Sequence, residues 1–168
     1  EKWYHLQEPL TEMINGTVYS MSEGTPKHSR ALESLRLLLS NYLKGKDSQA
    51  YTSELEITID EKNRFRPDIS VISGEPESGV PSLVIEITEP KTVGFDTGRK
   101  FMAYQKRGIK EYWIASPESE SIEQFVLKNG ILILKAIYAK TDPQATFKSA
   151  VFEDLEVNVP EIFSHDQG

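Results

Sequence analysis

The chain has 168 residues, of which 38% are hydrophobic and 27% are charged, a composition typical of a folded domain large enough for one hydrophobic core. Cysteine is absent and only three histidines occur, which excludes disulfides, zinc–thiolate sites and a histidine-rich metal site, so any metal ion must be held by oxygen. The net charge of -7 argues against a protein that coats nucleic acid through bulk attraction, and no apolar run approaches the roughly 20 residues needed to cross a bilayer.

Domain number, location and charge distribution follow from the same data. The length is that of one domain, residues 1–168. The first ten residues lack the basic start and apolar core of a signal peptide, so we expect a cytoplasmic protein unless a leader has been removed. Residues 91–110 hold six Lys or Arg against Asp96 alone, whereas residues 153–166 hold five acids and no Lys or Arg. A local basic face is therefore compatible with the acidic total.

The first elements of the chain are predicted to be a hairpin and a helix. Asn15-Gly16, between residues 12–14 and 17–19, is typical of a two-residue hairpin turn. Thr25-Pro26 predicts a helix N-terminus, the leucines at 32, 35, 39 and 43 recur at helical spacing, and Gly45 can end the helix. His28 lies in the first turn of this helix, where we expect an exposed side chain and not a metal ligand.

Three strands are predicted after this helix. From residue 51 the hydrophobic period is two, which predicts a strand with residues 55, 57 and 59 on one face and Glu54 on the other. A polar turn precedes a second strand over roughly 65–73, with Pro67 near its start, where proline is tolerated. Residues 81–88 are almost continuously apolar, and such a run predicts a central strand buried on both faces.

The second half of the chain is predicted to add a helix, a strand and a hairpin. Asp96 or Thr97 can cap a helix that reaches about residue 107, with Phe101 and Tyr104 facing inward and Gly108 as its stop. A short strand follows at 112–115, then a hairpin at 122–138, then a tail that we expect to pack across the surface. This order of elements predicts an α/β or α+β fold with a mixed sheet.

Two acids are expected to meet on neighbouring strands. If strands 65–73 and 81–88 pair antiparallel about the loop between them, Asp68 lies opposite residue 86 or 87. Glu86 shares a face with Val84, so its carboxylate projects from a core-like row, where an ionised acid is costly without positive charge nearby. A divalent cation offsets this cost and the repulsion between the two acids. Mg²⁺ (or Mn²⁺) takes oxygen ligands, so the predicted ligands are the carboxylates of Asp68 and Glu86 and the backbone carbonyl of Ile87.

Lys100 is the predicted positive group beside the metal. Hydrolysis of a phosphodiester needs positive charge near the attacking water and the transition state. Lys100 lies four residues after Asp96 and four before Tyr104, so the three share one helical face and Asp96 can orient the lysine. Helical side chains point back towards the N-terminus, here towards the end of the Glu86 strand. The predicted catalytic residues are therefore Asp68, Glu86 and Lys100, and the candidate phosphate contacts, which are equally explained as surface charge, are Lys106, Arg107 and Lys110.

These residues together resemble a known family. Arg66-Pro67-Asp68, residues 84–87, Asp96 with Lys100 and Tyr104, and residues 108–114 resemble the signature of the prokaryotic Uma-two family of putative restriction endonucleases, within the PD-(D/E)xK nuclease superfamily. The resemblance implies a restriction endonuclease-like mixed sheet flanked by helices, to which this sequence adds N- and C-terminal β-hairpins. It implies Asp68 and Glu86 as metal ligands, Glu54 as a candidate third acid, and Lys100 in place of a superfamily lysine at the position of Thr88.

Functions of different classes fit these patterns. The first is a Mg²⁺-dependent DNA endonuclease, a homodimer if it cuts both strands. The second is a non-catalytic nucleic-acid-binding or regulatory module on the same fold, which the acidic balance and Thr88 favour. A hydrolase of another phosphorylated substrate is a third. Structural interpretations also exist, because Pro-Asp is a common turn dipeptide, Glu86 can pair with a buried arginine and Lys100 can be solvated. The nuclease interpretation requires Asp68, Glu86 and Lys100 to converge in one cleft.

Overall fold

A six-stranded mixed sheet forms the centre of the computed structural model, which describes residues 9–21, 23–77, 79–90, 98–142 and 144–164. The sheet order is β10-β9-β8-β7-β6-β3. Strands β7 and β8 run parallel, and their other neighbours in this sheet run antiparallel. In chain order the strands of this sheet are β3 (Ser48–Thr52), β6 (Ile69–Ser73), β7 (Leu83–Ile87), β8 (Glu111–Ser116), β9 (Ser121–Lys128) and β10 (Ile131–Ala139).

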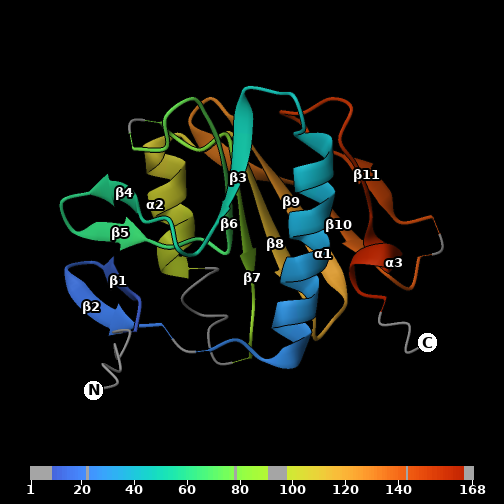
Figure 1. Ribbon diagram of the computed structural model, residues 1–168, viewed down its shortest axis with the longest axis horizontal. Coiled ribbons are helices and arrows are strands. Elements are labelled where there is room, and N and C mark those ends of the chain that lie inside the picture. Colours follow the sequence, from blue (N-terminus) through green and yellow to red (C-terminus); the bar gives the residue numbers. More distant parts are fainter. Residues whose placement is uncertain (1–8, 22, 78, 91–97, 143, 165–168) are drawn as a thin grey trace, which may run out of the picture.

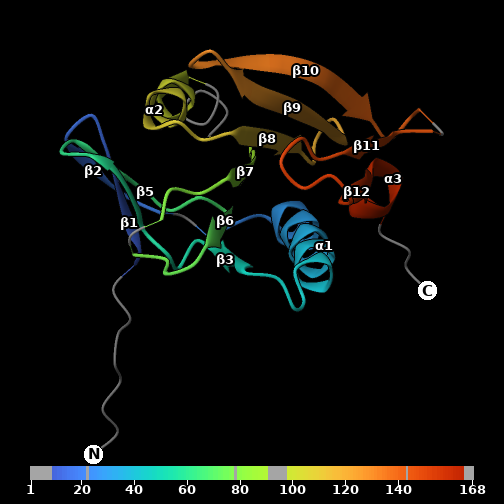
Figure 2. The ribbon, with the colours of Figure 1, turned by 90° about the horizontal axis from the view of Figure 1, so that it is seen from above.

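Helices cover both faces of this sheet. Helix α1 (Pro26–Tyr42) and the short α3 (Val159–Ile162) lie on one side, and α2 (Lys100–Arg107) lies on the other (Figures 1 and 2). Helix α2 connects β7 to its parallel neighbour β8, as a parallel pair requires a crossover connection. Among the described residues, none of the helices combines the length and the apolar character needed to cross a lipid bilayer.

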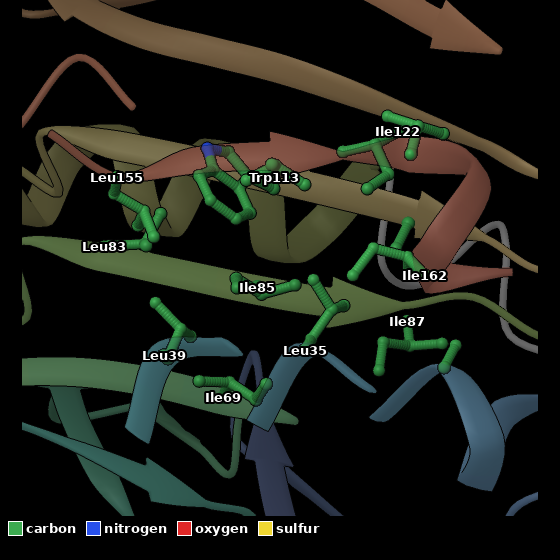
Figure 3. Packing of buried hydrophobic residues seen from close by; sticks show 14 of the residues in the cluster. Leu35, Leu39, Ile69, Leu83, Ile85, Ile87, Trp113, Ile122, Leu155 and Ile162 are labelled. Carbon is green, nitrogen blue, oxygen red and sulfur yellow. The ribbon is translucent and has the colours of Figure 1, made fainter. Parts of the chain in front are cut away.

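The core between the sheet and α1 forms because α1 presents apolar residues at helical spacing to the apolar face of the strands. Leu35 and Leu39 of α1 lie one turn apart and are fully buried. They pack over Ile85 of β7 and, further along the sheet, the core continues to Trp113 of β8 (Figure 3). All five residues of β7 are buried, which confirms the predicted central strand with apolar residues on both faces.

A second sheet of four strands lies beside α2, in the order β2-β1-β5-β4 (Figure 2). It consists of β1 (Thr11–Ile14), β2 (Thr17–Ser20), β4 (Ile57–Asp60) and β5 (Asn63–Phe65). The predicted N-terminal hairpin is confirmed, with Asn15 and Gly16 at φ 52° and 83° in its turn. The hairpin predicted at 122–138 corresponds to β9–β10, which extends the main sheet, and its turn residues Asn129 and Gly130 have the same geometry, at φ 52° and 78°.

Two of the predicted strands are each divided between the two sheets. The strand predicted from residue 51 is wrong as one element, because the N–H of Leu55 bonds to the carbonyl of Thr52 and turns the chain out of β3 towards β4. The strand predicted at 65–73 is interrupted between β5 and β6, where Pro67 has no N–H for a ladder. The period of two continues across Pro67 and is interrupted only at Ser53 between β3 and β4, so the hydrophobic period alone does not reveal either break.

The C-terminal segment lies deeper than predicted. It contains β11 (Thr146–Lys148), β12 (Glu156–Asn158) and α3. A tail across the surface was expected, but Leu155, Val157 and Phe163 are at most 1% exposed and belong to the same core as α1. The expectation was wrong because the far end of the β8–β9 part of the sheet needs an apolar cover that α1 alone does not supply (Figure 2).

Candidate active site

Asp68 and Glu86 lie opposite each other at one end of the sheet. The β6–β7 register pairs Ile69 with Ile85, so Asp68, one residue before β6, faces Glu86. This confirms the pairing predicted about the loop. Glu86 shares a strand face with Val84, which packs in the cluster on the α2 side of the sheet. The acid therefore points towards α2 and the four-stranded sheet, away from the α1 core.

Both carboxylate oxygens of Asp68 have polar contacts with the protein. Oδ2 accepts a hydrogen bond of 2.7 Å from the backbone N–H of Ile87, and Oδ1 lies 3.0 Å from Nε2 of His28 at the start of α1. The two side chains are only 13% and 14% exposed. The expectation of an exposed His28 was wrong, because the first turn of α1 ends against the motif Pro67-Asp68 and not in solvent.

Glu86 is 3% exposed and is surrounded by donors from α2. The hydroxyl of Tyr104 donates a hydrogen bond of 2.6 Å to Oε1, and the ammonium of Lys100 lies 3.5 Å from the same oxygen. Burial, and then the neighbouring negative charge of Glu86, raise the pKa of Tyr104 well above its usual value. Tyr104 is therefore a neutral donor to Glu86 throughout the physiological range.

Lys100 is the first residue of α2 and bridges two acids. Its Nζ lies 2.9 Å from Oε1 of Glu12 in β1, closer than to Glu86. The same oxygen of Glu12 accepts a hydrogen bond of 2.7 Å from the backbone N–H of Arg66, two residues before Asp68. Burial of the Lys100 ammonium is thus compensated by two carboxylates, as a charge at 4% exposure requires.

These groups line one pocket of about 430 Å³, within the range of small-ligand sites. Asp68, Glu86, Ile87 and Lys100 all reach it, so the predicted acids and the lysine converge. Exposed residues such as Glu23 and Gly24 also belong to its wall, which gives a route from solvent. Among its lining residues, carboxylates outnumber cationic side chains five to two: Glu12, Glu23, Asp68, Glu86 and Glu89 against Arg66 and Lys100.

Other predicted site residues lie elsewhere. Glu54 is exposed and does not line this pocket, although its backbone carbonyl accepts a hydrogen bond of 2.8 Å from Arg66. Asp96, with its expected roles as cap and partner of Lys100, falls outside the described residues. The three candidate phosphate contacts are exposed at the far end of α2 or beyond it, and none of them lines the pocket: Lys106, Arg107 and Lys110.

Thr88, two residues after Glu86, bonds to strand β8. Its hydroxyl lies 3.1 Å from Oγ of Ser116, and its backbone N–H donates to the carbonyl of Ala115 on β8. This side chain is 7% exposed and is used to extend the contact between β7 and β8. The ammonium near Glu86 comes from α2 instead.

Glu12 and His28 are members of the site that the sequence patterns did not reveal. The alternation of residues along β1 could have identified Glu12, because Glu12 and Ile14 share the buried face of this strand. A buried acid of this kind needs a cationic partner, as Glu86 does. His28 offers no comparable signal, since its contact with Asp68 joins residues 40 positions apart.

Three comparisons relate the chain to known proteins. The model of the Uma2 family, described as "Putative restriction endonuclease", matches residues 1–160. An uncharacterized protein of Synechocystis sp. is 30% identical over 132 residues, which are 74% of this chain and 70% of that protein. The crystal structure of a "putative nuclease belonging to DUF820" from Anabaena variabilis matches with a TM-score of 0.76 at 19% identity, over 92% of this chain and 90% of that chain. This likeness shows a shared fold and confirms the predicted fold class.

Proposed function

Because the chain belongs to the Uma2 family of restriction endonuclease-like proteins, we propose that it is a DNA endonuclease that depends on Mg²⁺ or Mn²⁺. One observation carries the proposal: the carboxylates of Asp68 and Glu86 and the ammonium of Lys100 line the same pocket. Two acids and a buried cation at a solvent-accessible pocket are the groups that metal-assisted phosphodiester hydrolysis uses.

The end of the β6–β7 ladder offers a third oxygen to a metal. The N–H of Ile87 points towards β6, since it donates to Asp68, whereas the next N–H along β7 donates to β8. The carbonyl of Ile87 points to the same side as its N–H, towards residue 67 in the antiparallel register. Proline at 67 has no N–H to donate to that carbonyl. We assign the carbonyl of Ile87 to the metal together with Asp68 and Glu86.

The donor set fits Mg²⁺ better than a metal that needs many protein ligands. Among the described residues, no three His, Asp or Glu side chains form a ready-made cluster. Mg²⁺ is commonly held by one or two carboxylates, with water and substrate phosphate completing its octahedron. When bound, such an ion polarises the phosphodiester and makes an attacking water easier to deprotonate.

The acidity of the pocket favours a role for metal in substrate binding as well. Five carboxylates against two cationic side chains repel a phosphodiester. A divalent ion between Asp68 and Glu86 offsets this repulsion where the phosphate enters. This excess of carboxylates inside the pocket, as distinct from the net charge of the chain, speaks against the alternative of a nucleic-acid-binding module that works without metal. Lys106, Arg107 and Lys110 are proposed to hold more distant phosphates, and a homodimer is proposed for cutting both strands.

Lys100 is proposed to act on the developing negative charge of the phosphate. Its ammonium lies beside Glu86 and enters the pocket from the start of α2. Tyr104 holds the same oxygen of Glu86 and thereby orients the carboxylate. Asp68 is oriented in the same way by His28 and by the backbone of Ile87. Both proposed carboxylate ligands are therefore oriented by other groups of the protein before the metal binds, as outer-shell partners of metal ligands commonly are.

The test is cleavage of supercoiled plasmid DNA by the purified protein with Mg²⁺, with Mn²⁺ and with EDTA. We expect metal-dependent nicking or linearisation, lowered by about 100-fold or more in Asp68→Asn and Glu86→Gln, because each removes a charge from the metal. Glu23→Gln is the matched control, since it removes an exposed carboxylate of the same pocket wall. Tight DNA binding without turnover, or cleavage that survives both substitutions, would reject the proposal.

A further inference from the structure

We infer that Glu12 of the N-terminal hairpin positions the ammonium of Lys100 in the site, an inference that rests on the proposed nuclease function. The sequence predicts the hairpin β1–β2 but does not indicate a part for it in the site. Of the acids that the structure describes around Lys100, Glu12 is nearer to the ammonium, with Oε1 at 2.9 Å against 3.5 Å for Glu86. The contact joins residues 88 positions apart, so it exists only in the folded protein.

Burial gives this contact its weight. The side chains of Lys100, Glu12 and Glu86 are 5%, 10% and 4% exposed, so water does not screen their charges effectively. Arg66, the other Lys or Arg side chain of this pocket, makes a longer ionic contact, at 3.8 Å from Glu56. Among the described residues, Glu12 is therefore the acid nearest to the Lys100 ammonium.

Metal binding makes the two carboxylates unequal. A divalent ion at Asp68 and Glu86 neutralises Glu86 and repels the ammonium. With Glu86 engaged, Glu12 is the acid that retains Lys100 in the pocket. Without it, the ammonium has two outcomes: it competes with the metal for Glu86, or it leaves the reacting phosphate. Both outcomes lower the rate of cleavage.

Glu12 also connects the lysine to the ligand-bearing segment. The oxygen that contacts Lys100 accepts the N–H of Arg66, whose guanidinium in turn donates to the carbonyl of Thr11 at 3.0 Å. The hairpin, the start of α2 and the chain just before Asp68 therefore meet at one carboxylate. This assigns the hairpin to the active site, with Glu12 as a positioning residue that touches neither metal nor substrate.

The experiment is a double-mutant cycle of Glu12→Gln and Lys100→Met, read in two ways. Glutamine keeps an acceptor for the Arg66 N–H and removes only the charge. In plasmid cleavage at saturating Mg²⁺ we expect Glu12→Gln to lower kcat by about tenfold or more with KM changed by less than about twofold. On the Lys100→Met background the same substitution should change kcat by less than about twofold.

The second reading is Mg²⁺ affinity by calorimetry without DNA. When Lys100 is present, Glu12→Gln should weaken Mg²⁺ binding by about threefold or more. When position 100 is methionine, Glu12→Gln should weaken Mg²⁺ binding no more than Glu23→Gln does. Glu12→Asp keeps the charge but shortens the reach, and it should regain part of kcat. Melting curves by circular dichroism verify that each variant is folded.

The outcomes separate the two proposals. If the wild type is active and Glu12→Gln changes kcat and Mg²⁺ affinity equally with Lys100 and with methionine at position 100, the positioning role is overturned and the nuclease proposal stands. The same conclusion follows if the wild type is active and Glu12→Gln changes neither quantity. A wild type that neither binds Mg²⁺ nor cleaves DNA overturns the proposed function, and the role of Glu12 with it.

Discussion

Gly24 and His28 lie so close that a β-carbon on Gly24 would stand 2.6 Å from Nδ1 of His28, nearer than non-bonded atoms approach. The other ring nitrogen of His28 is the one that contacts Asp68. A larger residue at position 24 would therefore displace the imidazole from its place beside the acid, and glycine leaves room for this arrangement.

Gly24→Ala is expected to displace His28 and release Asp68 without changing any polar group. Loss of a supporting group of this kind lowers metal affinity by about tenfold. The measurement is Mg²⁺ binding by calorimetry for Gly24→Ala, His28→Ala and the double variant, with the double variant no weaker than His28→Ala alone. Gly98→Ala is the control, since open space surrounds its β-carbon position. Wild-type affinity in Gly24→Ala would contradict the role of His28.

Pro67 provides a test of the Ile87 carbonyl. Pro67→Ala restores an N–H opposite Ile87, which can extend the β6–β7 ladder by one bond to that carbonyl. We expect unchanged or higher stability together with Mg²⁺ binding that is weaker by about tenfold, because the ladder now uses an oxygen assigned to the metal. Pro76→Ala, in the loop between the same strands, should leave Mg²⁺ affinity unchanged. A stabilised Pro67→Ala protein with full affinity would remove Ile87 from the ligand set.

Glu111 and Glu86 allow a comparison of a structural acid with a site acid. Glu111 is fully buried at the other end of β8, where it accepts hydrogen bonds from Trp113 at 2.7 Å, Gln124 at 2.8 Å and the backbone of Ala150 at 3.1 Å. These contacts attach the C-terminal segment to the sheet. Both oxygens of this carboxylate accept hydrogen bonds from side chains or backbone N–H groups of the protein itself, so we assign Glu111 a structural role.

Glu111→Gln should therefore cost about 3 kcal/mol or more of unfolding free energy and leave Mg²⁺ affinity unchanged. Glu86→Gln should do the reverse, with a large loss of affinity and a smaller loss of stability, because it removes a ligand while Gln retains an acceptor for Tyr104. Urea unfolding and calorimetry on the two variants measure the contrast. Equal effects on both quantities would mean that the two acids are not separable in this way.

Local signals explain which parts of the fold are predictable from the sequence. Asn15-Gly16 and Asn129-Gly130 need positive φ at both turn residues, which few other residue pairs accept, so these hairpins follow from four residues alone. The apolar run of β7 and the loop before it determine the register that brings Asp68 to Glu86. The convergence of these acids with Lys100 then follows from one helix that starts just after β7.

Contacts between distant parts of the chain account for the rest. Residues 51, 55, 57 and 59 are apolar and share one phase of a period of two, yet Ser48–Thr52 and Ile57–Asp60 join different sheets. Only the partner strands, β6 and β5, determine where the chain must turn. The same holds for Glu12 and His28, whose roles depend on partners 88 and 40 residues away. No short pattern encodes such a pair, although a buried acid on an amphipathic strand is a reason to search for one.

Tyr104 makes the folding stability of the protein depend on pH in the alkaline range. Burial and the charge of Glu86 raise the pKa of Tyr104 in the folded protein above its value of about 10 in the unfolded chain. The folded state therefore keeps the phenol proton more tightly, so the stabilisation is complete below about pH 10 and declines as the pH rises from there through the folded-state pKa.

In Tyr104→Phe this alkaline decline should be shallower, while at neutral pH the lost hydrogen bond to Glu86 should cost about 1–3 kcal/mol of unfolding free energy. Urea unfolding at about pH 7 and about pH 10.5 measures both effects, with Tyr51→Phe, a partly exposed tyrosine outside the pocket, as the control. If the wild type and Tyr104→Phe lose stability in parallel above about pH 10, the phenol is not the group whose proton the folded site retains.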